Sequence, residues 1–555
     1  MPSTHSAAGN LVHQERLFSN LSSFRELEQR IQALHDQNTK IVGDAFEIFI
    51  EAYLATQVTF QAERVWIVGQ VPPQVRQQLN LPADAKGIDG VFQTHSGELV
   101  PYQVKFRTER GTLNFTEVAP FLAITERAKD RILFTNARAL ATDAANRDAL
   151  RVVRRADLHQ LSEDDFRAIE AWLNELPRPK PELAPYPHEK EAIEQITAAF
   201  SADKRTTAVM ACGSGKTLVA LWVTEAIKPK SVLVLVPSLS LLSQTLREWC
   251  RANPWGAGFN FLCVCSDPTV SKGTDEIILH KTETPFRIDT DPQVVRDFLT
   301  RDLGGVRVVF STYQSIRVVA DGARGLPTFD MAIFDEAHKT TGPHGGTFAF
   351  ALDDNNLPIG KRLFLTATPR HYDINRRDRE GDFRIVSMDD EVVYGKVSYK
   401  LSFAEAARRD IICSYKILIS VITTDELNTY LLDHGITLVD GDKISVRWVA
   451  NQLALKRAIE QTDASKIITF HSRVRTAKVF VEASPRGIAR HINDFSVFHV
   501  NGEQPASVRD DTLDAFRDAD KALIANARCL TEGVDVPAVD MVAFIDPRKS
   551  RVDIA

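Results

Sequence analysis

The chain has 555 residues, of which 44% are hydrophobic and 25% are charged, and its formal net charge is −6. These values are ordinary for a globular protein, and the length predicts roughly three or four domains. No stretch reaches the ~18 consecutive apolar residues of a membrane span, and the N-terminus has no secretory pattern. The six cysteines show no metal-binding spacing. We therefore predict a cytoplasmic protein with reduced thiols and no membrane partner.

The first 176 residues predict an α/β domain. Apolar periodicity indicates a helix that begins near Phe24, and further helices are expected at 43–54, 115–128, 143–151 and 163–176. Strands are expected at 65–68, 90–94, 99–106 and 131–135, with a hairpin turn at Ser96-Gly97. A linker with five prolines follows at 177–187, and it is the clearest domain boundary in the sequence.

Two series of alternating strands and helices follow the linker. In the first, at 188–400, strands are expected at 207–211, 231–236, 307–311, 331–335 and 362–366. The second occupies 401–555 and is expected to begin near Ser414, with strands at 466–470, 497–500, 522–525 and 541–545. Strands that alternate with helices are typical of doubly wound parallel sheets, so we predict an α/β fold with two such domains.

A glycine-rich loop lies between the first strand and first long helix of this region. Its residues are Gly213, Ser214, Gly215, Lys216 and Thr217. Glycines allow backbone N–H groups to surround phosphate oxygens, and the helix N-terminus favours negative charge. In ATP-binding loops of this kind the lysine reaches the β- and γ-phosphates and the hydroxyl holds Mg²⁺. Met210 departs from the usual pattern, and the alternative is a glycine-rich turn that binds nothing.

Two acids follow the apolar strand expected at 331–335. Asp335 suits the Mg²⁺ shell, and Glu336 suits the role of a base that accepts a proton from the attacking water. Both are expected at the carboxyl end of a parallel strand, where open α/β sheets bind ligands. The alternative is a strand followed by a helix cap at Asp335, but the order of the two motifs favours the ATP site.

From residue 186 onward the chain resembles the superfamily 2 helicases, because seven motifs occur in the order typical of that family. Residues 335–338 resemble its DEAH box, and 366–369 resemble motif III, which couples hydrolysis to movement. The resemblance implies nucleic-acid contacts at Pro237, Ser238, Thr312, His471, Ser472 and Thr531, and cofactor contacts at Gly533 and Asp535.

Two departures from the family pattern affect what we expect. Glu189 stands where the family has an adenine-reading glutamine, and a glutamate accepts but cannot donate to a ring nitrogen. The arginine motif that follows motif V in the family is absent before Ala555. We therefore expect a second lobe that lacks this motif, a fragment of a longer protein, and ATP binding with slow turnover, since such arginines contribute ~10³–10⁵ in rate.

The N-terminal block contains residues that suit phosphodiester hydrolysis. Asp89 precedes a predicted strand, and Gln103 and Lys105 lie on one face of the next strand. A carboxylate and an amide oxygen can hold Mg²⁺, and the lysine supplies positive charge. Glu47, on an upstream helix, offers another carboxylate. Alternatively, Asp89-Gly90 is a turn and Gln103 and Lys105 lie on a solvated face.

This pattern resembles the Mrr-like branch of the restriction-endonuclease fold, in which glutamine replaces the usual second acid. The resemblance implies Asp89, Gln103 and Lys105 as catalytic residues, with Asp89, Gln103 and Glu47 on the metal. Residues 101–155 carry eleven Lys/Arg against six Asp/Glu, a balance of 11 − 6 = +5, which suits a surface that faces DNA.

Longer stretches, such as 265–270 and 387–395, resemble the bacterial single-chain type ISP restriction-modification enzymes. The resemblance implies an ATP- and Mg²⁺-dependent nuclease and translocase that acts on double-stranded DNA in restriction or phage defence. It also implies methyltransferase and target-recognition domains, or partner subunits, that this chain lacks. Two alternatives stay open: a repair helicase with a non-cleaving DNA-binding domain, and an inactive nucleotide-gated DNA-binding scaffold.

Overall fold

The computed structural model describes residues 3–35, 39–82, 87–141, 149–179, 183–265, 284–343, 347–370, 385–433, 443–483, 487–502, 504, 506–527 and 539–546. The chain divides into two compact units. Unit 1 comprises Met1–Asp267 and Leu279–Ser402, and unit 2 comprises Pro268–Ile278 and Phe403–Ala555. Among the helices of the described ranges, none has the length and apolar character that crossing a membrane requires.

The N-terminal part of unit 1 is built on a five-stranded sheet with the order β1-β2-β3-β4-β5. Its strands are β1 (Ala62–Ile67), β2 (Gly90–Thr94), β3 (Leu99–Lys105), β4 (Arg131–Thr135) and β5 (Leu150–Val153). The first three strands pair antiparallel, with a short turn between β2 and β3, whereas β3, β4 and β5 pair parallel. The long connection from β3 to β4 contains helix α4 (Phe115–Ile124), as a parallel crossover requires.

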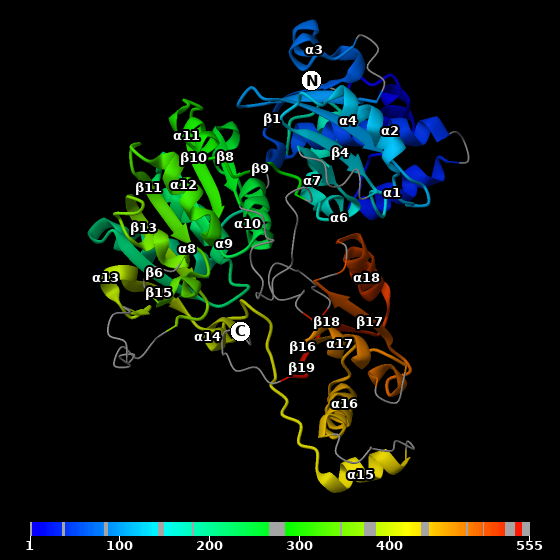
Figure 1. Ribbon diagram of the computed structural model, residues 1–555, viewed down its shortest axis with the longest axis vertical. Coiled ribbons are helices and arrows are strands. Elements are labelled where there is room, and N and C mark those ends of the chain that lie inside the picture. The colour runs from blue at the N-terminus through cyan, green and yellow to red at the C-terminus, as the bar shows by residue number, and fades with distance from the viewer. Residues whose placement is uncertain are drawn as a thin grey trace. The chain divides into compact units, whose positions relative to one another are not determined.

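Helices cover both faces of this sheet (Figure 1). One core contains residues of α1 (Phe24–Ala33), α2 (Thr39–Thr56) and α7 (Glu163–Leu173) together with the side chains of Tyr102 and Phe134. The opposite core joins α3 (Pro73–Leu79) and α4 to the side chains of Val91 and Leu133. Alternate strand residues therefore enter opposite cores, which is the period-2 pattern of a sheet buried on both faces.

The remainder of unit 1, lobe 1, contains an eight-stranded sheet in which every recorded pairing is parallel. The order is β15-β6-β13-β11-β7-β10-β8-β9. The strands are β6 (Arg205–Met210), β7 (Ser231–Val236), β8 (Phe259–Val264), β9 (Ile288–Asp289), β10 (Val306–Thr312), β11 (Phe329–Phe334), β13 (Ile359–Thr366) and β15 (Lys396–Leu401). The major helices are α8 (Pro187–Ala202), α9 (Lys216–Ile227), α10 (Leu239–Arg251), α11 (Pro292–Thr300) and α12 (Ile316–Ala323).

Unit 2 has a four-stranded parallel sheet with the order β17-β18-β16-β19. Its strands are β16 (Lys466–His471), β17 (Ser496–Asn501), β18 (Ala522–Ala527) and β19 (Met541–Phe544). Helices α16 (Lys443–Thr462), α17 (Val474–Phe480) and α18 (Ala506–Asp518) accompany it. The two parallel sheets confirm the predicted α/β class with two RecA-like lobes.

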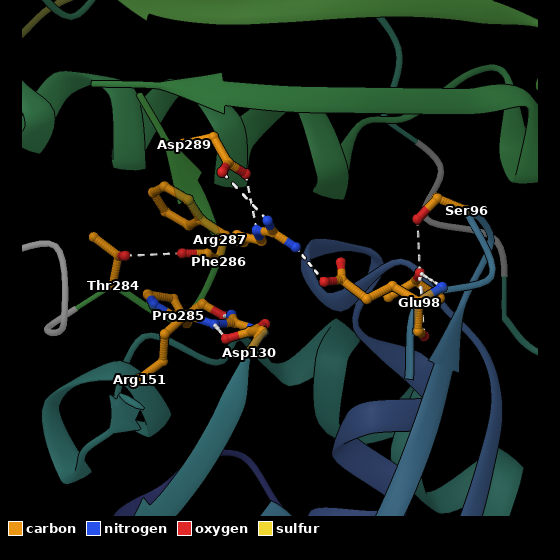
Figure 2. Close-up of polar contacts among 10 residues, drawn as sticks. Ser96, Glu98, Asp130, Arg151, Thr284, Pro285, Phe286, Arg287 and Asp289 are labelled. Atoms are coloured by element: carbon orange, nitrogen blue, oxygen red, sulfur yellow. Dashed lines mark hydrogen bonds and ion pairs between the residues drawn. The ribbon is translucent and has the colours of Figure 1, made fainter. Parts of the chain in front are cut away.

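Polar contacts join the N-terminal sheet to lobe 1 within unit 1 (Figure 2). Arg287, just before β9, forms ion pairs with Glu98 at the start of the β3 hairpin arm and with Asp289. Arg151 on β5 pairs with Asp130 and donates to the Pro285 carbonyl oxygen at 2.5 Å. The segment that leads into β9 is thus held by two arginine-centred contacts.

Two local predictions were wrong where the structure describes the residues concerned. A helix was expected at 143–151, but Leu150–Val153 is the buried edge strand β5. Residues 142–148 lie outside the described ranges. The second strand series was expected to begin near Ser414, but residues 413–420 form no strand, and the series begins at β16. Short apolar runs without clear periodicity do not distinguish a strand from a helix or an extended connection.

Candidate nucleotide and nuclease sites

The glycine loop lies between the end of β6 and the start of α9. Gly213 has φ 76° and Gly215 has φ 84°, a left-handed conformation that glycine adopts without strain. Gly215 also approaches Glu189 so closely that a Cβ there would collide with Glu189 Oε1. The loop therefore has the backbone shape and the helix N-terminus of a phosphate-binding loop. Ser214 is buried, and its hydroxyl donates to the Ala211 carbonyl oxygen at 2.7 Å.

Glu189 lies behind this loop. It is 3% exposed, and its Oε2 accepts a hydrogen bond from the Tyr186 backbone N–H at 2.8 Å, which caps α8. The neighbouring His188 ring contacts the Ser214 carbonyl oxygen at 3.1 Å. Burial raises the pKa of Glu189. The structure thus places Glu189 as a cap that also packs on the loop, while its predicted adenine contact stays a prediction.

Lys216 and Glu336 meet although 120 positions separate them. Lys216 Nζ donates to Glu336 Oε1 at 3.0 Å, and both side chains are largely buried. Glu336 Oε2 lies 3.3 Å from His338 Nδ1, which also lies 3.0 Å from the Thr366 hydroxyl at the end of β13. Burial alone would raise the pKa of Glu336, but the hydrogen bond with His338 and the Lys216 charge lower it to about 2. Glu336 is therefore an ionised carboxylate held by two partners.

Asp335 lies at the carboxyl end of β11, beside Glu336. Its carbonyl oxygen accepts a hydrogen bond from the Tyr313 hydroxyl at 2.7 Å, and its Oδ1 accepts one from the Glu336 N–H at 3.0 Å. Burial and the negative charge of Glu336 raise the pKa of Asp335, whereas Lys216 lowers it. Two adjacent buried acids with one lysine leave negative charge that a cation would stabilise, so the residues present fit Mg²⁺.

Thr217 is the second residue of α9 and contacts α10 from two atoms. Its carbonyl oxygen accepts a hydrogen bond from Trp249 Nε1 at 3.1 Å. Its hydroxyl hydrogen bonds to Glu248, whose pKa is raised by burial and lowered in part by Gln244 and Thr217. The Thr217 hydroxyl, which we predict to hold Mg²⁺, thus has a carboxylate neighbour in the structure.

The residues predicted to contact nucleic acid in lobe 1 lie in two adjacent turns. Gln314 Nε2 donates to the Pro237 carbonyl oxygen at 3.2 Å, which joins the turns after β7 and β10. Ser238 caps α10 by accepting the Leu241 N–H at 3.3 Å, and the Thr312 hydroxyl lies 2.9 Å from Ser315 Oγ. Ser238 and Thr312 are both buried, and their contact with nucleic acid stays a prediction.

In unit 2, His471 ends β16 and is 1% exposed, while Ser472 is exposed. The His471 ring lies 3.0 Å from the Thr469 hydroxyl, and burial lowers its pKa to about 4. Ser472 N–H donates to Asp546 at 2.6 Å. Thr531, Gly533 and Asp535 lie outside the described residues.

A second polar cluster surrounds Asp89 in the N-terminal sheet. Asp89 Oδ2 accepts the Val104 N–H at 2.6 Å, which fixes it beside β3. Burial and the charge of Glu47 raise the pKa of Asp89 to about 7, and Lys105 and His5 oppose that shift. The charges of Glu47 and Lys105 thus act on Asp89, while the nuclease role of these residues stays a prediction.

Gln103 completes this cluster. Its Nε2 donates to the Gly87 carbonyl oxygen at 2.8 Å, whereas its buried Oε1 has no hydrogen-bond partner in the part of the chain that the structure describes. An unpaired buried carbonyl oxygen costs free energy unless a donor or a cation satisfies it. The orphaned oxygen and the Asp89 carboxyl, whose pKa burial raises, fit a divalent cation that Asp89, Gln103 and Glu47 would hold.

Two family models match the chain. "Type III restriction enzyme, res subunit" matches residues 182–371, and "Helicase conserved C-terminal domain" matches residues 450–554. The first match covers the glycine loop and the acid pair, and the second covers most of unit 2. The chain belongs to the superfamily 2 helicases, which confirms the family predicted from the motifs.

Individual relatives extend this result. The chain is 26% identical over 373 residues to the probable helicase A859L of African swine fever virus, which covers 66% of this chain and 38% of the viral protein. It is 24% identical over 386 residues to the DNA 3'-5' translocase XPB2 of Sulfurisphaera tokodaii, which covers 64% of this chain and 75% of that protein.

Among solved structures, the DNA-bound ATP-dependent type ISP restriction-modification enzyme LlaBIII matches 95% of this chain with a TM-score of 0.75 and 25% identity. The match confirms the predicted resemblance to type ISP enzymes and includes the N-terminal sheet as well as the motor. This chain spans 36% of the LlaBIII chain, so it corresponds to roughly a third of that protein.

The sequence did not reveal four residues of these sites. His338 was quoted in the acid motif but given no role, and Tyr313 and Glu248 contact site residues from other elements. His5, near the N-terminus, lies 3.3 Å from Glu47. The position of His338 in the acid motif was a signal for its role, whereas Tyr313, Glu248 and His5 act through tertiary contacts that no spacing pattern shows.

Proposed function

We propose that this chain is the nuclease and motor part of a bacterial restriction or phage-defence enzyme. ATP hydrolysis drives the motor along double-stranded DNA, and the N-terminal domain cuts the DNA with Mg²⁺. The proposal includes a cytoplasmic location and further domains or subunits for methylation and target recognition. The observation that carries it is the match to LlaBIII over 95% of the chain, because that match spans both polar clusters.

The chemistry of the motor site follows from its contacts. ATP supplies the phosphoryl group and Mg²⁺ supplies positive charge when both are bound, with Thr217 and Asp335 as the residues that hold the ion. Lys216 turns from Glu336 toward the phosphates, which removes one of the two partners that lower the pKa of Glu336, the other being His338. Glu336 then becomes a stronger base, oriented by His338, and accepts a proton from water.

The nuclease cluster has the groups that phosphodiester hydrolysis requires. Asp89, Gln103 and Glu47 would hold Mg²⁺, which supplies charge to the scissile phosphate when bound. Lys105 lies near enough to Asp89 to lower its pKa, so its ammonium stabilises negative charge at the same place. The basic excess of residues 101–155 supplies a surface for the DNA backbone.

The motor is tested with two variants of the full chain. Lys216→Ala is expected to abolish binding of a fluorescent ATP analogue, whereas Glu336→Gln retains binding and loses roughly 10²–10⁴ in DNA-stimulated hydrolysis. Exposed Lys190, on α8, supplies the matched control Lys190→Ala. Persistent DNA binding without any ATP turnover in the wild-type protein would favour an inactive scaffold instead.

The nuclease is tested by nicking of supercoiled plasmid with Mg²⁺ and ATP. Lys105→Ala and Asp89→Ala are expected to remove nicking while ATP binding persists. Arg64→Ala changes an exposed arginine of the same domain, outside residues 101–155, and should leave nicking intact. Nicking that survives both site variants would indicate a contaminating nuclease and favour a repair-type helicase with a DNA-binding N-terminal domain.

A further inference from the structure

An N-terminal arm, residues 3–7, lies against one face of helix α2. Asp44, Glu47 and Glu51 share this face, because positions three and four apart are neighbours on a helix. Ser3 Oγ donates to Glu51 Oε2 at 2.5 Å, and His5 Nε2 lies 3.3 Å from Glu47 Oε2. The arm therefore contacts the acidic face at two points.

The arm is anchored at its other end. It leads into the π-helical turn Gly9–Gln14, in which Leu11 and Val12 are buried in the same core as α2. Within the arm, the His5 N–H lies 3.4 Å from Ser3 Oγ, and the Ala7 N–H donates to His5 Nδ1 at 3.2 Å. The first contact holds the backbone of His5 and the second holds Nδ1 of its imidazole ring.

The hydrogen bond from Ala7 also determines the state of the ring. A nitrogen that accepts an N–H has a free lone pair, so His5 Nδ1 carries no proton. In the neutral ring the proton is then on Nε2, which faces Glu47. His5 Nε2 accordingly donates a hydrogen bond to Glu47 Oε2.

We propose that His5 is a positioning residue of the nuclease site, which orients the Glu47 carboxylate toward the metal held with Asp89 and Gln103. The inference rests on the proposed nuclease function and deepens it. Glu47 is on a helix and 32% exposed, so its side chain would otherwise adopt several rotamers. A hydrogen bond from the anchored arm to Oε2 restricts those rotamers and leaves Oε1 for the ion.

A different role for His5 must be separated from this one. His5, Asp44 and Glu47 each offer a ligand atom, and these atoms lie within 4.8 Å of one another, so the trio could hold a metal itself. Ligation through Nε2 would require a proton on Nδ1 and loss of the Ala7 hydrogen bond. Asp44 lies 3.9 Å from His5 Nε2, which is longer than a hydrogen bond. The contacts favour donation to Glu47.

The experiment measures Mn²⁺ binding to the full chain without nucleotide or DNA, by electron paramagnetic resonance of the free ion. The Mn²⁺ binding that remains in the Asp89→Ala variant defines the background from the motor site. His5→Ala is expected to weaken the Asp89-dependent binding by roughly 10-fold or more, the usual effect of removing a partner of a ligand. His5→Gln retains an N–H donor and is expected to restore affinity close to wild type.

The matched control is His13→Ala, because His13 is exposed in the same N-terminal turn and has no role in the proposed site. A nitrogen modulation from imidazole in the electron spin-echo spectrum of bound Mn²⁺ would overturn the positioning role, since it would identify His5 as a ligand. Unchanged Mn²⁺ affinity in His5→Ala would overturn it as well. Thermal unfolding of each variant excludes a general loss of structure.

Plasmid nicking distinguishes failure of this inference from failure of the nuclease proposal. If the nuclease proposal holds and His5 has no role, Lys105→Ala loses nicking while His5→Ala nicks normally. If the N-terminal domain is no nuclease, Lys105→Ala and Asp89→Ala nick at the wild-type background. A parallel loss of Mn²⁺ affinity and nicking in His5→Ala, with recovery of both in His5→Gln, supports the inference.

Discussion

Buried histidines of this chain differ according to the groups that surround them. His338 contacts Glu336 and Thr366 and so holds a carboxylate of the motor site. The His471 ring lies against the Thr469 hydroxyl and the Phe480 ring, and burial lowers its pKa to about 4 although the charge of Asp546 opposes the shift. A buried histidine therefore orients an acid in lobe 1, where it is His338, and resists protonation in unit 2, where it is His471.

The low pKa of His471 predicts that unit 2 is sensitive to acid. The unfolded chain binds a proton near the ordinary pKa of 6.5, whereas the folded chain binds one only near pH 4. Stability is therefore lost as the pH falls through that window, by up to roughly 1.4 kcal/mol per pH unit. His471→Gln is expected to remove this part of the pH dependence while leaving stability at pH 7.5 nearly unchanged.

Urea unfolding at pH 7.5 and 5 measures this effect. Trp448 is the sole tryptophan of unit 2 in the sequence, so its resonance in protein labelled with fluorotryptophan reports on that unit. His13→Gln, in unit 1, is the control. Identical losses of stability in wild type and His471→Gln would contradict the assignment.

The loop between β6 and α9 illustrates how elements constrain one another. Gly215 has φ 84° and lies against the carboxylate of Glu189, which caps α8. The contact joins the N-termini of two helices, so the shape of the phosphate loop depends on a residue that is 26 positions earlier. Thr366 lies at the end of β13, the strand between β6 and β11. Its hydroxyl contacts His338 and so links the strand beside the phosphate loop to the acid pair.

Gly215→Ala is expected to distort the loop for two reasons. A non-glycine residue in the left-handed region costs about 1–2 kcal/mol, and the new Cβ would collide with Glu189. The affinity for ADP should therefore fall by roughly 10-fold or more, since 1.4 kcal/mol corresponds to a factor of ten.

Titration with a fluorescent ADP analogue tests this expectation. Gly69→Ala is the control, because no atom lies within 4 Å of a Cβ at Gly69. The double variant Gly215→Ala, Glu189→Ala removes the collision but keeps the backbone strain, so it should recover part of the affinity. Wild-type affinity in Gly215→Ala would show that the loop does not need this conformation.

On the scale of unit 1, the nuclease-like sheet and lobe 1 share polar contacts around β9. Arg287 pairs with Glu98, which immediately precedes β3, the strand that contains Gln103 and Lys105 (Figure 2). Arg301, after α11, donates to the Ser96 carbonyl oxygen at 2.7 Å in the same hairpin. These contacts border a cavity of about 440 Å³. The hairpin that includes two residues of the proposed nuclease site is thus bonded directly to the motor.

A double-mutant cycle measures the Arg287–Glu98 contact. Arg287→Gln and Glu98→Gln are each expected to destabilise the hairpin, and the double variant should lose less than the sum. The coupling should be about 0.5–1 kcal/mol, because both side chains are partly exposed. Hydrogen exchange of the backbone amides of residues 90–105 measures this coupling. The exposed pair Arg324 and Asp321 supplies a control cycle, and additive effects at 287 and 98 would indicate no coupling.

The sequence by itself determined the motor, because its function depends on local patterns. Glycines before a helix, acids after an apolar strand and motifs in a fixed order predicted the α/β lobes and the family, which the fold and the family models confirm. Strands such as Ser231–Val236 and Gly90–Thr94 were predicted to the residue, since short polar turns bound clear apolar runs. The edge strand β5 was missed, because pairing with β4 stabilises it and its own periodicity does not.

The tertiary structure alone decided which side chains meet. Lys216 and Glu336 come together because β6 and β11 flank β13 in one sheet. No single segment of the sequence determines this order of strands. His5 reaches Glu47 because the N-terminal arm packs on α2. Only the folded structure shows that Gln103 Oε1 has no hydrogen-bond partner among the described residues. Long-range packing creates these contacts, so local sequence patterns could not predict them.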